Sequence, residues 1–482
     1  MPIRVLSTEL YVLPMRTRMP FRYGIITVTE LPHLFLKAEV EVDGRRQTGF
    51  AADHLALKWF TKNPDSSHLR DTLELVEVIE SACTIARAVP KVPTVFAFWK
   101  YLYEMQSAWG GGWGKPPLLS HFGTSLVERA VIDAFCKARS VPFWKAIRHN
   151  TLGVELGTLQ PELEGTQPAD WLPPAPLGEV IARHTIGLID PLTDSQIADA
   201  DRIQDGLPQS LEACIRAYGL THFKIKLCGE APKDIDRIRN IAAVLQCTVA
   251  DGDYRYTLDA NENFKSAGGF REFWSKLSEE PSLSDFLTRL LFVEQPLHRD
   301  VALSAAVGHE FVAWPDRPPM IIDESDGSVP SAREALALGY VGTSHKNCKG
   351  VIKGLGNACL IASRNKTSPA AQFRISGEDL LNVGPIALLQ DLAVVSALGI
   401  ADVERNGHHY FRGLAAIPEG VQAAVLKNHG DLYRLANGGY PSVRPVGGRL
   451  RIGSVNAAPF GTAFDFDPTA FIPFSTWSKG LS

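Results

Sequence analysis

Eight short candidate strands, five apolar and three with a weaker pattern, recur from about residue 185 onward, roughly 20 to 40 residues apart, with helical patterns between them. They lie at or end in residues 185–187, 223–226, 257–259, 292–294, 321–323, 342–346, 373–376 and 401–404. Alternating strands and helices are typical of an α/β fold with a parallel sheet, and eight such units favour a closed barrel. An open doubly wound sheet is the alternative, but no Gly-x-Gly-x-x-Gly turn follows any strand.

The first part of the chain predicts a separate α+β unit. Residues 1–60 read as short strands, and Asp43-Gly44 is a strong signal for a hairpin turn. Helical spacing follows at 71–90 and 125–138. The 482 residues are about three times a typical domain of roughly 150 residues, so two parts are expected.

Three local patterns add detail to this first part. Ser125 and Glu128 fit a capping box, which would begin a helix at Ser125. Residues 108–117 contain Gly-Lys but lack the other glycine of a phosphate-binding loop, so they predict a flexible loop. Residues 160–178 are rich in proline and glutamate and predict a linker.

Composition excludes several classes of protein. Apolar residues make up 45% and charged residues 21%, which is typical of a globular protein and not of a disordered one. With 49 basic and 53 acidic residues the formal charge is -4, so no basic surface for nucleic acid is expected. No apolar run approaches the roughly 18 residues that a membrane span needs. The seven scattered cysteines form no C-x-x-C pair, and we expect a cytoplasmic protein without nucleic-acid or membrane partners.

Two lysines share one face of the second predicted strand. Side chains alternate across a strand, so Lys224 and Lys226 lie on the face opposite Phe223, Ile225 and Leu227. In a barrel the apolar face packs against the helices, and the lysines therefore point into the barrel mouth. The alternative is an edge strand with both lysines in water.

Three carboxylates close the next three apolar strands. Asp259, Glu294 and Asp323 end strands that lie about 4.8 Å apart when they are neighbours in a sheet, so the three side chains can converge. Converged anions raise one another's pKa, and a hard divalent cation with oxygen ligands, Mg²⁺ or alternatively Mn²⁺, relieves this repulsion. Each carboxylate taken singly could instead cap a helix.

A further lysine follows on the sixth predicted strand. Lys346 has the parity of Gly342 and Ser344, whose small side chains leave room on the inner face. It would then lie across the mouth from Lys226. Lys349 is the alternative if the register of this polar strand differs.

In this order the residues resemble the motifs of the enolase superfamily, in its muconate lactonizing enzyme subgroup of the mandelate racemase/muconate lactonizing enzyme family. The resemblance spans about residues 20–430 and rests on Lys224-x-Lys226, Asp259-Ala260-Asn261, Glu294-Gln295-Pro296, Asp323-Glu324-Ser325 and a sixth-strand lysine. It implies a (β/α)₇β modified TIM barrel, residues 171–435. An N-terminal α+β capping domain, residues 1–170, would be completed by residues 436–482. Family members often form symmetric homo-oligomers, which is expected here by analogy.

The resemblance also implies a reaction, in which the α-proton of a small carboxylate substrate is abstracted and a bound Mg²⁺ stabilises the enediolate. A lysine normally has a pKa of about 10.4, so a lysine base must be brought to about 7–8. Lys226 is the expected base and Lys224 its electrostatic partner, while Lys346 could return a proton to the other face. Racemisation or epimerisation of an N-acyl amino acid or a dipeptide is favoured. Cycloisomerisation, β-elimination and a catalytically silent barrel protein remain alternatives.

Substrate specificity is expected to come from the capping domain and from the eighth strand. Arg22 could pair with an anionic distal group and Tyr23 could pack on an apolar one. Asn261 belongs to the second motif and is a further candidate for substrate binding. Asp402 and Glu404 have the parity to face an α-ammonium group.

Two other patterns receive structural interpretations. His408 and His409 are adjacent, and adjacent positions face opposite sides of a strand, so a loop is expected there and not a joint metal site. Cys228 and Cys348 follow the lysine strands and are expected to be packing residues.

Overall fold

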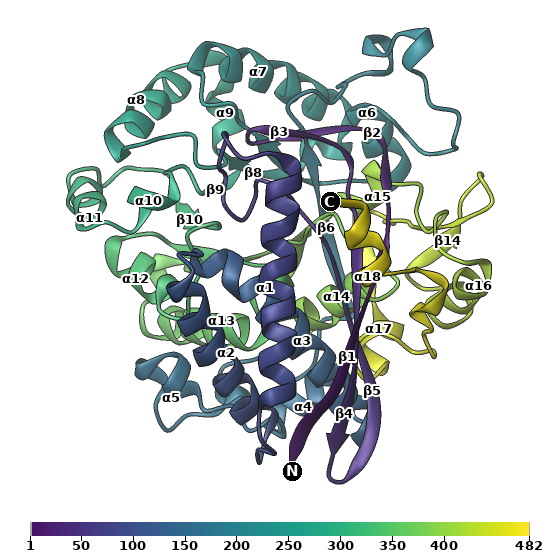
Figure 1. Ribbon diagram of the computed structural model, residues 1–482. Helices are drawn as coiled ribbons and strands as arrows, with labels where there is room; N and C mark the ends of the chain where they lie inside the picture. The colour runs from purple at the N-terminus through teal and green to yellow at the C-terminus, as the bar shows by residue number, and fades with distance from the viewer. Residues whose placement is uncertain (1, 482) are drawn as a thin grey trace.

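The computed structural model describes residues 2–481 and contains a closed parallel barrel beside a second layer of antiparallel strands and long helices (Figure 1). The barrel strands are β6 (Glu179–Ile186), β7 (His222–Lys226), β8 (Arg255–Asp259), β9 (Leu290–Glu294), β10 (Met320–Ile322), β11 (Gly342–His345), β12 (Arg374–Gly377) and β13 (Asp402–Glu404). Neighbouring strands pair in parallel, and β13 pairs with β6, which closes the ring. The predicted strands and the parallel barrel are therefore confirmed.

Helices alternate with these strands and cover the outside of the barrel. One main helix follows each of the first seven strands: α6 (Leu211–Tyr218), α7 (Ala231–Thr248), α8 (Ala267–Ser278), α11 (Ala305–Val312), α12 (Ser331–Leu338), α13 (Val351–Thr367) and α14 (Ala387–Leu398). Phe223 and Ile225 of β7 pack outward in the same hydrophobic cluster as Ile238 and Ile241 of α7. This order is the predicted (β/α)₇β arrangement.

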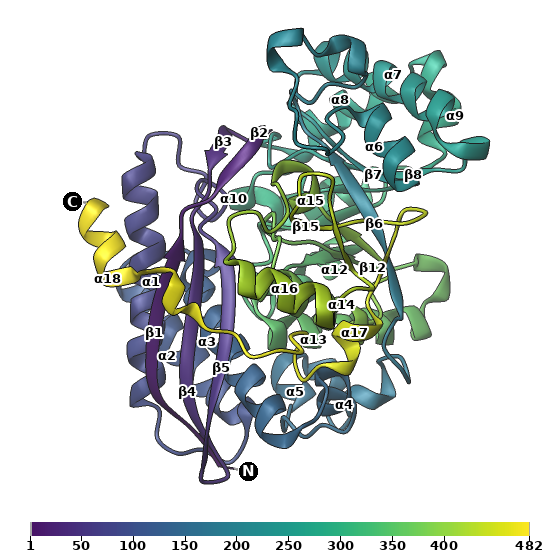
Figure 2. The ribbon, with the colours of Figure 1, turned by 90° about the vertical axis from the view of Figure 1, so that its right-hand side faces the viewer.

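The N-terminal part forms a sheet that stands beside the barrel (Figure 2). Its strands are β1 (Ile3–Leu13), β4 (His33–Val42), β5 (Arg45–His54) and the short β17 (Ile472–Pro473), in the order β17-β1-β4-β5. The predicted turn at Asp43-Gly44 joins β4 to β5, and both residues have positive φ angles, as the tight hairpin requires. A separate hairpin, β2 (Arg16–Tyr23) and β3 (Ile26–Glu30), extends from this layer towards the barrel.

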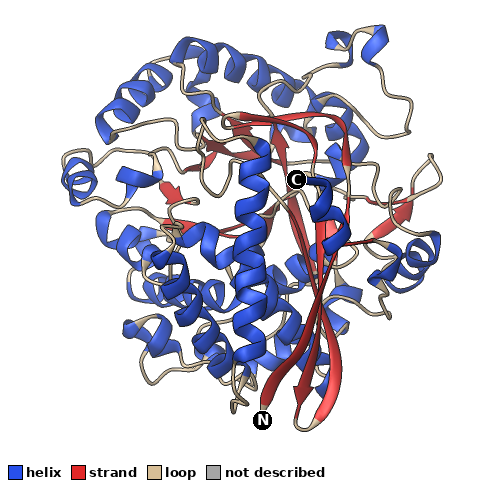
Figure 3. Ribbon diagram, viewed as in Figure 1, coloured by secondary structure: helices blue, strands red, loops and turns tan. Residues whose placement is uncertain are grey.

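Three long helices, α1 (His68–Ala88), α2 (Val95–Gly112) and α3 (Pro117–Arg139), pack on this sheet (Figure 3). The approach of α3 to β5 is close, because a Cβ atom added to Gly49 would lie 1.9 Å from the carbonyl oxygen of Ala130. A glycine at position 49 therefore lets the helix lie directly on the strand.

The predicted start of the second helix is wrong. Helix α3 begins at Pro117, a residue type that suits the first helical position, and the Ser125 hydroxyl donates to the carbonyl of Phe122 within the helix. Likewise α2 continues to Gly112, so only the end of the predicted 108–117 loop is non-helical. Burial of the apolar faces of both helices outweighs the weak helix propensity of the glycines.

Segment 160–178 and the C-terminal segment both contact more than one part of the molecule. The predicted linker carries two short helical turns, Pro161–Leu163 and Pro168–Asp170, before it reaches β6. Near the C-terminus β16 (Arg449–Arg451) pairs antiparallel with β6 of the barrel, whereas β17 pairs with β1. The segment from Arg449 to Pro473 therefore bridges the barrel and the N-terminal sheet.

Glu128 joins the N-terminal part to the barrel. It lies in the middle of α3, is 1% exposed, and its Oε1 accepts a hydrogen bond from the backbone N–H of Val351 at the start of α13. Its Oε2 has no hydrogen-bond partner. Burial raises the pKa of Glu128 to about 8, against a usual value of 4.5.

This raised pKa predicts that stability falls with increasing pH. Below about pH 4.5 the carboxyl is protonated in both states and its contribution is complete; as pH rises towards 8, only the unfolded chain gains by ionising. The folded state should therefore lose stability progressively across this window, by about 1 kcal/mol per pH unit in its middle. Glu128→Gln keeps the acceptor oxygen and cannot ionise, so its thermal midpoint should increasingly exceed that of the wild type between pH 5 and 8. Equal pH slopes for both proteins would contradict the prediction, and exposed Glu104, as Glu104→Gln, is the control.

Candidate active site

The carboxyl ends of the barrel strands place ionisable side chains at the same height along the barrel axis. Strand register pairs Lys226 with Asp259 and Asp259 with Glu294. Alternation along each strand then directs these side chains to the inner face, because the intervening residues Ile225, Leu258 and Val293 pack outward. The rim therefore concentrates charge at the mouth of the barrel.

Lys224 lies at the centre of this group. Its Nζ is 2.8 Å from Glu294 Oε1, 3.1 Å from Glu378 Oε2, 2.8 Å from Glu404 Oε2 and 3.0 Å from Asp259 Oδ2. Burial alone would lower the pKa of Lys224, but the four carboxylates together raise it well above its usual range. Lys224 is therefore a permanent cation that neutralises part of the acidic cluster.

Lys226 has fewer partners than Lys224. Its Nζ contacts Asp259 Oδ2 at 2.5 Å, and no other carboxylate is paired with it among residues 2–481. It is 6% exposed and lines the cavity described below. Lys226 therefore faces the cavity with a single carboxylate contact among residues 2–481, whereas Lys224, which also lines the cavity, has four.

Lys346 lies across the barrel from Lys226. The two side chains come from β7 and from the end of β11, which are four positions apart in a ring of eight strands. Lys346 Nζ contacts Asp323 Oδ2 at 2.8 Å and also Glu378. Burial alone would lower the pKa of Lys346. The two carboxylates raise it by more, so the pKa of Lys346 lies well above its usual range.

The alternative residue, Lys349, is turned away from the cavity. Its Nζ donates to Ser344 Oγ at 2.7 Å and contacts Asp323 Oδ1 at 3.2 Å. Lys349 is not among the residues that line the cavity, whereas Lys346 is. The structure therefore places Lys346 at the mouth and Lys349 behind Asp323.

Glu378 is a member of the cluster that the sequence interpretation missed. It follows Gly377, the last residue of β12, and it contacts Lys224, Lys346 and Arg183. Burial alone would raise the pKa of Glu378. The three cations lower this pKa by more, so the net pKa lies well below the usual range of a glutamate. The signal was available, since Glu378 closes its strand as Asp259, Glu294 and Asp323 close theirs.

The acidic residues fit a divalent cation. One oxygen from each of Glu294, Asp323 and Glu378 lies within 4.8 Å of the other two. Within the described part of the chain, Glu294 Oε2 is buried without a hydrogen-bond partner. Burial, together with Asp259 and Glu378, raises the pKa of Glu294 well above its usual range. Buried carboxylate oxygens of this kind suit Mg²⁺ or Mn²⁺. Asp259, the third predicted ligand, lies beside this trio and contacts both strand lysines.

A cavity that is partly open to solvent lies above the cluster. The N-terminal part contributes Phe21, Tyr23, Ala56 and Trp59 to its wall. The barrel contributes the remaining lining residues, namely Lys224, Lys226, Asp259, Asn261, Asp323, Lys346, Asp379, Leu380, Leu381, Glu404 and Asn406. The charged groups thus face an apolar wall built partly from the capping layer, an arrangement typical of small-molecule sites.

Three of the five predicted substrate-binding residues lie in the wall of this cavity. Tyr23 reaches it from β2, and its hydroxyl donates to the carbonyl of Leu57 at 3.1 Å. Asn261 lies beside Asp259, and its Oδ1 is buried without a partner. Glu404 accepts hydrogen bonds from Thr185 at 2.6 Å and Asn406 at 2.8 Å.

The other two predicted residues do not join the site. Arg22 is exposed, because alternation along β2 turns it to the side opposite Phe21 and Tyr23. Asp402 has the parity of Glu404 but lies one layer deeper in the barrel, where it pairs with the buried Arg183. Parity gave the correct face for Asp402 and could not give its depth.

The remaining sequence interpretations concern residues outside the cavity. His408 and His409 lie in a helical turn, α15 (Gly407–Tyr410), and not in a loop, and both are buried. Cys348 is buried and Cys228 is partly buried. No helix within residues 2–481 is long and apolar enough to cross a membrane.

No family model and no curated protein matches the chain in sequence. Solved structures do match. N-succinyl Arg/Lys racemase from Bacillus cereus is 15% identical, with 96% of this chain and 98% of that chain covered and a TM-score of 0.56. Muconate lactonizing enzyme from Pseudomonas fluorescens complexed with muconolactone is 15% identical, with 98% and 99% covered and a TM-score of 0.58.

Dipeptide epimerase from Enterococcus faecalis, complexed with Mg and the dipeptide L-Leu-L-Tyr, is 15% identical, with 85% of this chain and 92% of that chain covered and a TM-score of 0.57. At this level of identity the comparisons establish a shared architecture. The chain has the fold of the mandelate racemase/muconate lactonizing enzyme structures, a modified TIM barrel with an N-terminal capping domain.

Proposed function

We propose that the chain is a Mg²⁺-dependent enzyme of the mandelate racemase/muconate lactonizing enzyme family that abstracts the α-proton of a carboxylate substrate. The observation that carries the proposal is the placement of Lys226 and Lys346 on opposite sides of one cavity whose floor is acidic. Two proton-transfer groups on two faces of a bound molecule are what the inversion of a stereocentre requires.

Mg²⁺ would be held by Glu294 and Asp323 together with Asp259, as first predicted, or with Glu378. Removal of an α-proton concentrates negative charge on the substrate carboxylate, and the bound cation supplies electrostatic stabilisation of that charge. Lys224 also stabilises this negative charge, because its side chain stays cationic within the cluster.

Lys226 is proposed as the base. Its carboxylate partner, Asp259, holds Nζ at the cavity surface and directs it towards the substrate. A base must lie within hydrogen-bond reach of the proton that it takes, and Lys226 is a cavity-lining residue on the required wall.

Lys346 is proposed as the partner on the opposite face. Its two carboxylate contacts keep it protonated, so it can donate a proton from Nζ to the carbon from which Lys226 has taken one. The Trp59 ring, whose centroid lies 5.2 Å from Nζ, closes this side of the cavity and limits the access of water.

An N-acyl amino acid or a dipeptide is the substrate class that we favour. The cavity has a charged floor for the α-carboxylate and an apolar wall, made partly by Phe21, Tyr23 and Leu381, for a side chain. Glu404 could accept a hydrogen bond from a substrate nitrogen at the edge of the cluster. The likeness to a racemase of succinylated amino acids and to a dipeptide epimerase supports this class.

A cycloisomerase or a β-elimination lyase is the second candidate. The contacts that keep Lys346 protonated favour it, because a permanent cation opposite the base stabilises an enolate without transferring a proton. The likeness to muconate lactonizing enzymes points in the same direction.

The decisive experiment incubates the protein with Mg²⁺ and a panel of N-acyl amino acids and dipeptides in deuterated water. Deuterium incorporation at Cα with inversion, observed by NMR and chiral chromatography, is the expected result. Loss of water or ring closure would assign the lyase or cycloisomerase reaction instead. If no panel member exchanges and no Mg²⁺ binds by calorimetry, the proposed function is wrong and the chain is a silent barrel protein.

A further inference from the structure

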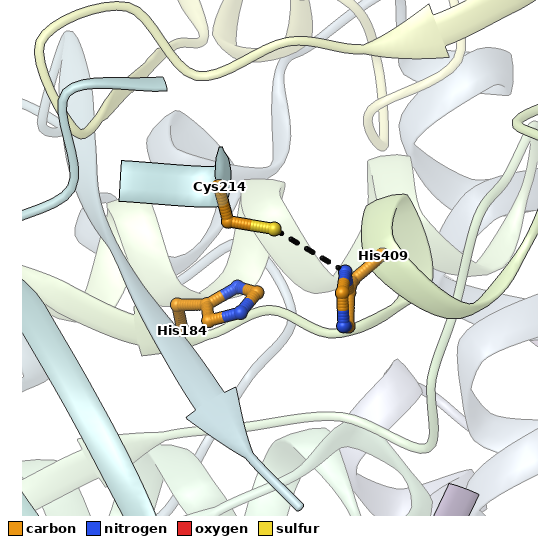
Figure 4. Close-up of side chains that lie close together, drawn as sticks. All are labelled: His184, Cys214 and His409. Carbon is orange, nitrogen blue, oxygen red and sulfur yellow. Dashed lines mark hydrogen bonds between the residues drawn. The ribbon is translucent and has the colours of Figure 1, made fainter. Parts of the chain in front are cut away.

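Three potential metal ligands meet on the outer side of the barrel, away from the cavity. His184 belongs to β6, Cys214 to α6 and His409 to α15 (Figure 4). Alternation along β6 turns Arg183 and Thr185 inward, and His184 therefore points outward towards α6. Nothing in the proposed reaction uses these three side chains, because none of them lines the cavity.

The three side chains already have the spacing of a ligand set. One ligand atom of each lies within 4.8 Å of the other two, and Cys214 Sγ is 3.5 Å from His409 Nδ1. Figure 4 shows the sulfur and both imidazole rings directed towards one another. His184 Nδ1 is buried with no hydrogen-bond partner among residues 2–481, although buried ring nitrogens are usually paired.

The cluster is closed off from solvent. His184 and His409 are each 2% exposed and Cys214 is 0% exposed. Arg18 donates to the backbone carbonyl of His409 at 3.0 Å and is itself paired with Asp205. Asp190, on the other side, accepts from Tyr410 and from the backbone of Gly187.

We propose that His184, Cys214 and His409 form a binding site for a thiophilic monovalent cation, Cu⁺, with one sulfur and two nitrogen ligands. Thiolate is a ligand that selects soft metals such as Cu⁺, and imidazole also suits copper. The group of candidate ligands in residues 2–481 has three members, whereas structural Zn²⁺ sites almost always have four.

Charge favours Cu⁺ over Zn²⁺ at this position. Binding breaks the Cys214 S–H bond, the sulfur keeps the electron pair as a thiolate ligand, and the proton leaves to solvent. The thiolate and Cu⁺ then sum to zero charge, whereas Zn²⁺ with the same ligands would leave a buried positive charge near Arg18.

The test uses a background without the accessible thiols, Cys228→Ser/Cys247→Ser, because Cys247 is exposed and Cys228 partly buried. Anaerobic titration with Cu⁺, buffered by a coloured Cu⁺ chelator, should give one equivalent per chain. Cys214→Ser in the same background should weaken Cu⁺ binding at least about 100-fold. Cys359→Ser is the matched control, because Cys359 is also fully buried and belongs to no ligand group within residues 2–481.

X-ray absorption at the copper edge of the loaded background protein makes the test independent of how well the variants fold. One sulfur and two nitrogen scatterers are expected. Absence of Cu⁺ uptake, equal uptake by Cys214→Ser, or a copper spectrum without sulfur would overturn the proposal. Retention of Zn²⁺ under conditions where Cu⁺ is not retained would overturn the choice of metal.

Discussion

Replacement of Lys226 by methionine is expected to reduce kcat/KM by about 10²- to 10⁴-fold, the range that a positioned general base contributes. Methionine preserves the length and most of the volume of the side chain while it removes the amine, so packing at the end of β7 should persist. Deuterium exchange at the substrate Cα should stop with racemisation, because Lys226 is the group that takes the proton. Exchange is measured by NMR in deuterated water.

The control for this variant is Lys233→Met, an exposed lysine of α7 that pairs with Glu230 at the surface. Its activity should equal that of the wild type. Circular dichroism and the thermal midpoint of Lys226→Met should also stay close to the wild type. A correctly folded Lys226→Met protein that retains a tenth or more of the activity would show that another group is the base.

Glu294→Gln is expected to weaken Mg²⁺ binding by at least about 100-fold and to reduce turnover to a comparable extent at limiting Mg²⁺. The reason is that Glu294 belongs to the trio of close oxygens and its Oε2 has no protein partner. Glutamine fills the same space without the charge. The Mg²⁺ affinity is measured by calorimetry, and the activity by titration of Mg²⁺ into protein treated with a chelator.

The wild type treated with chelator should lose activity and regain it with Mg²⁺ or Mn²⁺. Glu272→Gln, an exposed glutamate of α8, provides the matched loss of one surface charge and should bind Mg²⁺ like the wild type. Unchanged Mg²⁺ affinity in Glu294→Gln would remove this residue from the proposed ligand set. It would leave the assignment of Lys226 untouched, since the two experiments report on different groups.

Sequence reasoning was most successful where only the alternation of a strand was needed. Lys224 and Lys226 face inward because Phe223 and Ile225 must pack on the helices, and this follows from the two-residue period of a strand. Asp259 and Glu294 lie at one level because neighbouring parallel strands end at the same rim. Their catalytic and metal-binding roles stay predictions.

Failures occurred where the position depends on contacts across the fold. Glu378 was missed because the seventh strand was taken to end at Ser376, two residues short of the carboxylate. Asp402 was assigned to the site by parity alone, but the register of β13 against β6 sets it a layer lower, beside Arg183. Arg22 lies in the β2–β3 hairpin, and which face of this hairpin is turned towards the cavity depends on how the capping layer packs on the barrel.

The amino-acid sequence by itself determined the order of strands and helices, the closure into a parallel barrel and the inner face of each strand. These properties depend on periodicity and on apolar burial, which are local along the chain. Only the tertiary structure decided which lysine reaches the cavity, that Glu378 joins the acidic cluster, and that His184, Cys214 and His409 meet. These properties depend on register and packing between segments up to some 200 residues apart. The position of a charged side chain depends on which charged partners the fold brings close to it.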